Sequence, residues 1–136
     1  MSGIVDLTEL IKSMEPTKRQ EGLVFCTLDW ENLPEQPIDP LMLFKEAEGF
    51  TVIISEDKAQ ELNLHYDDVW DWIELSVHSS LSAIGFIAAV SKMLADNGIS
   101  VNVVSAFHHD HLFIKHKDSK KAIKLLTEMS KSLSSE

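Results

Sequence analysis

The sequence has one cysteine and no long uninterrupted apolar run in its 136 residues. The single cysteine, Cys26, excludes an internal disulfide and a metal site built from several cysteines. No segment approaches the ~18 apolar residues of a membrane span, and the first residues lack the basic and apolar regions of a signal peptide. These absences predict a cytoplasmic protein that works in reducing conditions.

Motifs for nucleotide binding and for nucleophilic catalysis are also absent. The chain contains no glycine-rich dinucleotide fingerprint, no phosphate-binding loop and no Gly-x-Ser-x-Gly turn. Ser79 and Ser80 follow His78, but neighbouring residues of a strand point to opposite faces, so helix capping is the better interpretation of these serines. Cys26 lies in an apolar run and is expected to be buried and unreactive. The sequence therefore predicts no catalytic residue and no enzyme activity.

The negative charge is concentrated in the first part of the chain. The net charge is −10, and residues 1–74 carry 17 acidic and 5 basic side chains, whereas residues 75–136 carry 5 acidic and 7 basic ones. An acidic surface repels phosphate backbones, which argues against nucleic acid as a partner. We interpret the acidic half as a solubility feature, with an acidic docking face as the alternative.

The length fits one domain, and the first half shows the alternation of helix and strand signals expected of a mixed fold. Three of the four prolines fall in an irregular connection, residues 29–49, where we expect a short helical turn at 41–45. Ser55 can cap the helix that follows the second strand. The elements predicted in this half are a helix over 4–14 that ends before Pro16, strands over 22–27 and 50–54, and a short helix through Leu62.

The second half has clearer periodicity. Ser79, Ser80 or Ser82 can cap a helix that runs to Asn97-Gly98, with Gly85 one turn inside it, where glycine costs about 1 kcal/mol relative to alanine. The other predicted elements are strands over 72–77, 99–106 and 112–114, and a last helix with Ala122, Leu126, Met129 and Leu133 on one face. Within strand 72–77, Ile73 and Leu75 share one face and Trp72 and Glu74 the other.

The two halves repeat one order of elements: helix, glycine, strand, connection, strand, helix. The second half reads strand–helix–strand–strand–helix, which lacks only a final strand to be a ferredoxin-like βαββαβ unit. An unpaired sheet edge would otherwise be exposed, so the missing strand has to come from the first half or from a second chain. We therefore expect two intertwined βαββαβ-type layers that form one core rather than two separate domains joined by a linker.

Several short motifs resemble those of the ACT domain family, in particular the stand-alone bacterial proteins made of tandem ACT-like units. The motifs are His78-Ser-Ser-Leu81, Gly85, Asn102-Val-Val104 and His109-Asp-His-Leu-Phe113. The resemblance covers about residues 22–130 and is strong over 72–126. It implies an α+β fold of two interleaved ferredoxin-like units, with antiparallel sheets and helices on one face. The implied units are residues 1–70, which include the proline-rich connection, and residues 71–136.

The resemblance also implies a function. ACT domains are regulatory modules that bind small molecules, often amino acids, between units, and they commonly form dimers. Free amides at a helix start suit a carboxylate, and an asparagine side chain suits an α-amino group. The implied partners are therefore an amino-acid effector and a second copy of the chain, with no cofactor and no metal. Carried over residue by residue, the implied ligand-binding residues are Ser79, Ser80, Leu81, Ile84, Gly85, Asn102 and Val103.

Two alternatives to a small-molecule sensor follow from other features. A ligand-free module could regulate a partner enzyme through the acidic half or an exposed strand edge. The histidines around Asp110 suggest a metal-dependent hydrolase as a second alternative, because His and Asp are ordinary metal ligands. Turn and strand-end hydrogen bonding is the preferred interpretation of these residues, which are His108, His109, Asp110, His111 and His116. Trp30, Trp70 and Trp72 are interpreted as core or interface anchors.

Overall fold

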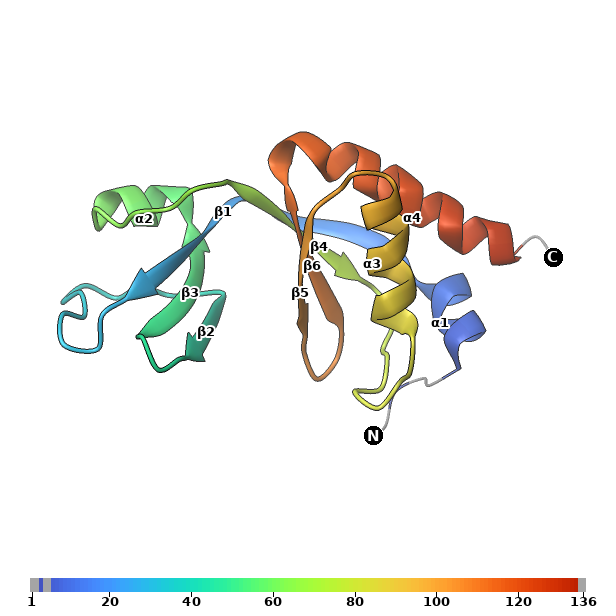
Figure 1. The fold of residues 1–136 in the computed structure, drawn as a ribbon, viewed down its shortest axis with the longest axis horizontal. Coiled ribbons are helices and arrows are strands. Elements are labelled where there is room, and N and C mark those ends of the chain that lie inside the picture. Colours follow the sequence, from blue (N-terminus) through green and yellow to red (C-terminus); the bar gives the residue numbers. More distant parts are fainter. Residues whose placement is uncertain (1–2, 4–5, 135–136) are drawn as a thin grey trace. The chain divides into compact units, whose positions relative to one another are not determined.

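The chain forms two compact units in a computed structural model that describes Gly3 and residues 6–134 (Figure 1). Unit 1 combines Met1–Glu21 with Asp71–Glu136, and unit 2 is Gly22–Trp70. The described strands follow the hydrogen-bonded order β2-β3-β1-β4-β6-β5. The chain enters unit 2 within β1 (Pro16–Leu28) and leaves it at the start of β4 (Trp70–Leu75).

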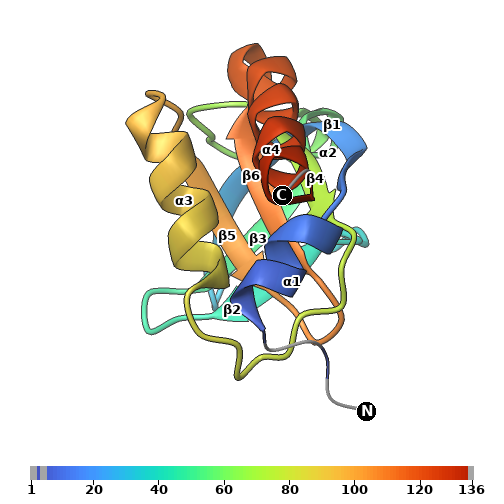
Figure 2. The ribbon, with the colours of Figure 1, turned by 90° about the vertical axis from the view of Figure 1, so that its right-hand side faces the viewer.

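Unit 1 has the layered arrangement that the periodicity of the second half predicts. In strand order, the first part of β1 lies next to β4, then β6, then β5. The helices α1, α3 and α4 gather on one face of these strands and pack against one another (Figure 2). The further elements of this unit are α1 (Leu7–Ser13), α3 (Phe86–Asp96), β5 (Val101–Ser105), β6 (Asp110–Lys115), a 3₁₀ turn (His116–Asp118) and α4 (Ser119–Ser134).

The strand missing from the second half is supplied by the first half. β1 lies directly beside β4, which gives unit 1 the order β1-β4-β6-β5. The pairing uses polar residues: the Thr17 and Ser76 hydroxyls are 3.0 Å apart, and Arg19 Nη2 lies 2.6 Å from Glu74 Oε2. Cross-strand pairs of this kind stabilise a strand whose residues are not apolar. They explain why β1 begins at Pro16, six residues before the apolar run that predicted it.

The core of unit 1 lies between its strands and its helices. Ile73 and Leu75 of β4 are fully buried there, on the strand face that the sequence alternation predicts. Helix α3 contributes Val90 and Leu94, and α4 contributes Leu126. The burial of these side chains removes apolar surface from water and holds the three helices on the strands.

Unit 2 consists of the second part of β1 with β3 (Phe50–Ser55), β2 (Met42–Lys45) and α2 (Glu56–Glu61). β3 lies between β2 and β1 and is antiparallel to both. Its core includes Val24, Cys26, Val52 and Ile54. Cys26 is buried as predicted, and burial raises the pKa of its thiol, which disfavours the reactive thiolate.

Two local predictions in unit 2 have different outcomes. Ser55 caps α2 as predicted, since its hydroxyl accepts a hydrogen bond from the Lys58 amide at 3.1 Å. The helical turn expected at 41–45 is wrong, because Met42–Lys45 is strand β2. β2 pairs with β3 across a tight turn in which the Glu46 and Gly49 amides and carbonyls bond each other. The partner strand therefore overrides the local signal of the proline-rich connection.

Candidate functional site

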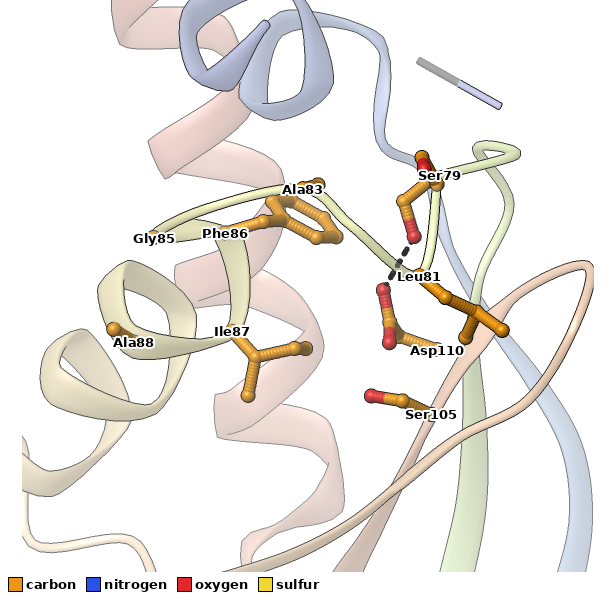
Figure 3. Close-up of a pocket in the computed structure, with 10 residues that line it drawn as sticks. Ser79, Leu81, Ala83, Gly85, Phe86, Ile87, Ala88, Ser105 and Asp110 are labelled. Atoms are coloured by element: carbon orange, nitrogen blue, oxygen red, sulfur yellow. Dashed lines mark hydrogen bonds between the residues drawn. The ribbon is translucent and has the colours of Figure 1, made fainter. Parts of the chain in front are cut away.

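A cavity of about 180 Å³ lies at the N-terminus of α3 in unit 1 (Figure 3). The loop before α3, the first turn of α3 and the facing ends of β5 and β6 line it. This volume is comparable with cavities that hold a benzene-sized ligand. The lining residues are Ser79, Ser80, Leu81, Ala83, Gly85, Phe86, Ile87, Ala88, Ser105 and Asp110.

The N-terminus of α3, with its free backbone amide groups, lies at this cavity. Gly85 is the N-cap residue, with a φ of 89°, and no side chain caps the helix. The predictions that Gly85 lies inside the helix and that a nearby serine caps it are therefore wrong. A left-handed φ is the conformation that glycine adopts without strain, so here glycine favours the helix start. The first turn carries no acidic residue, which leaves the positive end of the helix dipole uncompensated by its own side chains.

Asp110 provides a buried negative group on the other side of the cavity. The residue is 5% exposed, and its Oδ2 accepts a hydrogen bond from Ser79 Oγ at 2.7 Å. Figure 3 shows the Asp110 side chain between those of Ser79 and Ser105, with Leu81 and Ile87 nearby. A cavity with a carboxylate on one wall and helix amides on another can bind a small molecule that carries both an ammonium and a carboxylate group.

The loop at this cavity is fixed by a close backbone contact with the N-terminal segment. A Cβ added at Gly3 would lie 2.5 Å from the His78 carbonyl oxygen and 2.8 Å from the Ser80 amide nitrogen. Only glycine allows this approach. The segment that holds Ser79 and Ser80 therefore packs against a residue far away in the sequence.

The predicted site residues fall into two groups. Ser79, Ser80, Leu81 and Gly85 all line the cavity. The other three predicted residues do not line it. Ile84 is 86% exposed, Val103 packs against the core of unit 1, and Asn102 is exposed on β5. Asn102 is three positions from Ser105, and successive strand residues alternate, so its side chain points to the opposite face. The ligand-binding role of all seven residues stays a prediction.

The position of Asp110 in the sequence indicates that its side chain is buried, although an aspartate in a hairpin is normally expected to be exposed. The preferred interpretation gave Asp110 a turn-stabilising role in a histidine hairpin. In the structure Asp110 begins β6 and shares its face with Leu112 and Ile114, both fully buried. An acidic residue in phase with two core residues is unusual, because a buried carboxylate needs partners. That phase relation could have identified it.

The histidines of the β5–β6 hairpin take part in hydrogen bonds and ring contacts. His111 accepts a hydrogen bond from Trp72 Nε1 at 2.9 Å, and His109 Nδ1 lies 3.7 Å from Glu74 Oε1. Burial lowers the pKa of His111 below its ordinary value of 6.5. Burial opposes ionisation of Glu74, but the hydrogen bond from Arg19 and the nearby cationic groups outweigh it and lower the pKa of this carboxyl.

Among the described residues, one group has the spacing of metal ligands, and it lies away from the histidine hairpin. Glu21, Asp71 and His116 bring ligand atoms within 4.8 Å of one another. The ammonium of Lys18 lies 2.9 Å from Glu21 and 3.4 Å from the buried Asp71, and His116 Nδ1 is 3.0 Å from Asp71. The hydrogen bond to Glu21 raises the pKa of Lys18 despite partial burial. We interpret the group as an ion-pair network in which Lys18 balances the carboxylates.

Comparison with known protein families settles the family. A model described as ACT domain matches residues 2–71, and a second ACT domain model matches residues 70–128. The chain belongs to the ACT domain family. The resemblance noted in the sequence, including the tandem arrangement, is therefore confirmed, and so is the α+β class. No curated protein matches the chain.

Several solved structures share this fold. A Vibrio cholerae protein described as of unknown function and possible transport protein is 32% identical, over 91% of this chain and 95% of its own, with a TM-score of 0.79. An Agrobacterium tumefaciens protein is 19% identical, over 86% and 89% of the two chains, with a TM-score of 0.71. The regulatory subunit of aspartate kinase from Thermus thermophilus is 10% identical, over 84% and 95%, with a TM-score of 0.60.

The matched family models describe ACT domains, which are regulatory modules rather than catalytic ones. The aspartate kinase structure is itself described as a regulatory subunit. Within the part of the chain that the structure describes, no helix combines the length and apolar character needed to cross a membrane. The ACT domain matches support a regulatory role for the chain.

Proposed function

We propose that the protein is a non-catalytic regulator that binds an amino acid at the N-terminus of α3. The observation that carries the proposal is the cavity between the uncapped α3 amides and the buried Asp110 carboxylate. The α-carboxylate of an amino acid would lie against the amides of Phe86 and Ile87, and its ammonium against Asp110. The volume of about 180 Å³ suits a small side chain.

The regulatory output would be a change in assembly. ACT domains commonly pair, and β5 is the outer strand of unit 1, with an edge that a second copy could use. A ligand shifts such an equilibrium only by the difference in its affinity for the two states. We propose a cytoplasmic homodimer whose geometry responds to the amino acid, with residues 1–70 and 71–136 as its two ACT-like sequence units.

A thermal-shift screen of the protein against the twenty amino acids tests the binding proposal. A ligand at a hundred times its dissociation constant adds about 2.7 kcal/mol to the free energy of unfolding, which for this chain length raises Tm by roughly 5 to 10 °C. We expect one amino acid, or a few of similar size, to give such a shift. A screen in which all twenty leave Tm unchanged would contradict the proposal.

Two matched variants locate the binding. Asp110→Asn keeps the size of the side chain but removes the charge that would face the ammonium, so we expect the shift to disappear. Glu128→Gln removes one negative charge from the exposed face of α4, a helix that contributes no residue to the cavity lining. It should leave the shift intact. Equal Tm shifts in both variants would show that the amino acid does not bind at Asp110.

A further inference from the structure

Nearly all the net charge of the protein belongs to unit 2. Residues 22–70 contain 11 acidic side chains and two lysines, a net charge of −9, whereas the rest of the chain has a net charge of −1. Charge of one sign at this density creates a potential that attracts cationic partners and repels acidic ones. Unit 2 also contains an unprotected sheet edge, which shows where such a partner would bind.

Strand β2 is the outer strand of unit 2, and its hydrogen-bonding pattern can be assigned residue by residue. The Glu46 and Gly49 amides and carbonyls bond each other, and the register pairs Phe44 with Thr51 and Met42 with Ile53. Hydrogen-bonded pairs alternate along an antiparallel ladder, so Phe44 and Met42 bond to β3. The main-chain groups of Leu43 and Lys45 therefore point away from β3, toward the open edge.

The same strand exposes large apolar side chains. Leu43 is 50% exposed and Phe44 is 64% exposed, on opposite faces of β2, and Leu41, just before the strand, is also exposed. Lys45 is the one cation of the strand, and its ammonium lies 5.2 Å from the centre of the Trp30 ring. Sheet edges are normally protected by several charges, by proline or by a covering segment. β2 combines an open ladder with apolar side chains, the features of a strand that accepts another strand.

We propose that the β2 edge of unit 2 binds an extended, basic segment of a partner protein by strand addition. The added strand would pair its main chain with Leu43 and Lys45, place apolar side chains beside Leu43 and Phe44, and place lysines or arginines toward the acidic surroundings. A second copy is the wrong occupant, because it would bring another unit with a net charge of −9 to the same edge. This interaction is independent of the amino-acid site in unit 1.

Labelled heptapeptides test the proposal by fluorescence anisotropy with the full-length protein. The probe is Lys-Val-Lys-Val-Lys-Val-Lys, and the charge control is Glu-Val-Glu-Val-Glu-Val-Glu. A second control repeats the basic peptide with N-methyl groups on alternate residues, which keeps its charge but blocks strand pairing. We expect saturable binding of the basic probe alone, weakened by salt. Equal binding of the methylated peptide would reduce the interaction to non-specific charge attraction and overturn the proposal.

A substitution pair in β2 tests the edge itself. Leu43→Pro removes an amide that points outward, so the bonds between β2 and β3 are kept, and proline is tolerated on edge strands. Leu43→Thr makes a similar loss of apolar surface but keeps the amide. We expect Leu43→Pro to weaken the basic probe at least tenfold relative to Leu43→Thr. Equal affinities would place the peptide elsewhere and refute strand addition at β2.

Two further measurements check the folding and the assembly state of the Leu43 variants. Urea unfolding shows whether Leu43→Pro is folded, and if it is not, Phe44→Thr replaces it, with the same expectation of weakened probe binding. Sedimentation velocity compares the assembly state of the wild type and of the Leu43 variant that remains folded. The proposal expects no difference. Loss of a dimer in that variant would show that a second copy occupies the edge, and would overturn the choice of partner.

Discussion

At the residue scale, Gly85 has a conformational role that separates it from the other cavity residues. Its φ of 89° lies in the left-handed region, while an added Cβ would meet only Leu7 Cδ2 at 3.6 Å, an ordinary contact. Space is therefore available and backbone strain is the cost. We predict that Gly85→Ala lowers the free energy of unfolding by about 1–2 kcal/mol.

The control for Gly85 is Gly85→Asn, since asparagine adopts left-handed conformations more readily than alanine. Urea denaturation of both variants should give the smaller loss for asparagine. If alanine and asparagine cost the same, or neither costs anything, the cap conformation described for Gly85 is incorrect.

His111 gives a second prediction at this scale, in the pH dependence of stability. Its Nδ1 accepts a hydrogen bond from Trp72, which requires the neutral ring, and burial lowers its pKa. The unfolded chain therefore binds this proton more readily than the folded one. The contribution of neutral His111 is complete above the ordinary value of 6.5 and is lost as the pH falls below it, through the lower pKa of the folded state.

We therefore expect His111→Gln to reduce the loss of unfolding free energy between pH 7.5 and pH 5.5, measured by urea denaturation. His65 is the matched control because its side chain is 87% exposed. His65→Gln should behave like the wild type. A pH dependence that His111→Gln leaves unchanged would show that another group is responsible.

At the element scale, two serines that look alike in the sequence have different roles. Ser55 caps α2, whereas Ser82 precedes α3 by several residues and its side chain caps no helix. We predict that Ser55→Ala costs about 1 kcal/mol and that Ser82→Ala changes stability by less than about 0.5 kcal/mol. Thermal or urea unfolding distinguishes them. An equal cost at both positions would argue that the start of α3 is wrongly placed.

Elements with an internal apolar period could be predicted from the sequence, and those defined by a partner strand could not. The period identifies α4 through Ala122 and Leu126, and β3 through its apolar run. The polar start of β1 is stabilised because Arg19 has a partner on β4 and Thr17 has one just after β4, 55 and 59 residues away in the sequence. No local pattern contains that information. The helical turn predicted at 41–45 is wrong for the same reason, because β2 is defined by its pairing with β3.

The residues of the cavity could likewise be predicted from the sequence only where they follow a local pattern. The loop and the glycine could be found because Ser79, Ser80, Leu81 and Gly85 lie in one short segment that resembles a family motif. Asp110 and Ser105 join them only through the β5–β6 pairing, in which these two residues are directly opposite each other. The place of these two residues in the cavity could therefore be recognised only from the folded structure.

At the scale of the whole molecule, the first 21 residues belong to the unit formed by the end of the chain. The fragment 71–136 lacks β1 and so leaves the outer edge of β4 unpaired, and it lacks α1, whose Leu10 is fully buried in the core. We predict that this fragment does not fold alone, as judged by the dispersion of its amide NMR signals. A well-dispersed monomeric fragment would show that the interleaving is dispensable.

The central proposal is that the N-terminus of α3 and Asp110 together bind an amino acid. Titration of ¹⁵N-labelled protein with each of the twenty amino acids, followed by amide chemical shifts, tests it most directly. The account predicts that at least one of them shifts the amides of Gly85, Phe86, Ile87 and Asp110 in a saturable way, and that Asp110→Asn abolishes the effect. Saturable shifts that leave these residues unaffected, or no shifts at millimolar concentration, would contradict it.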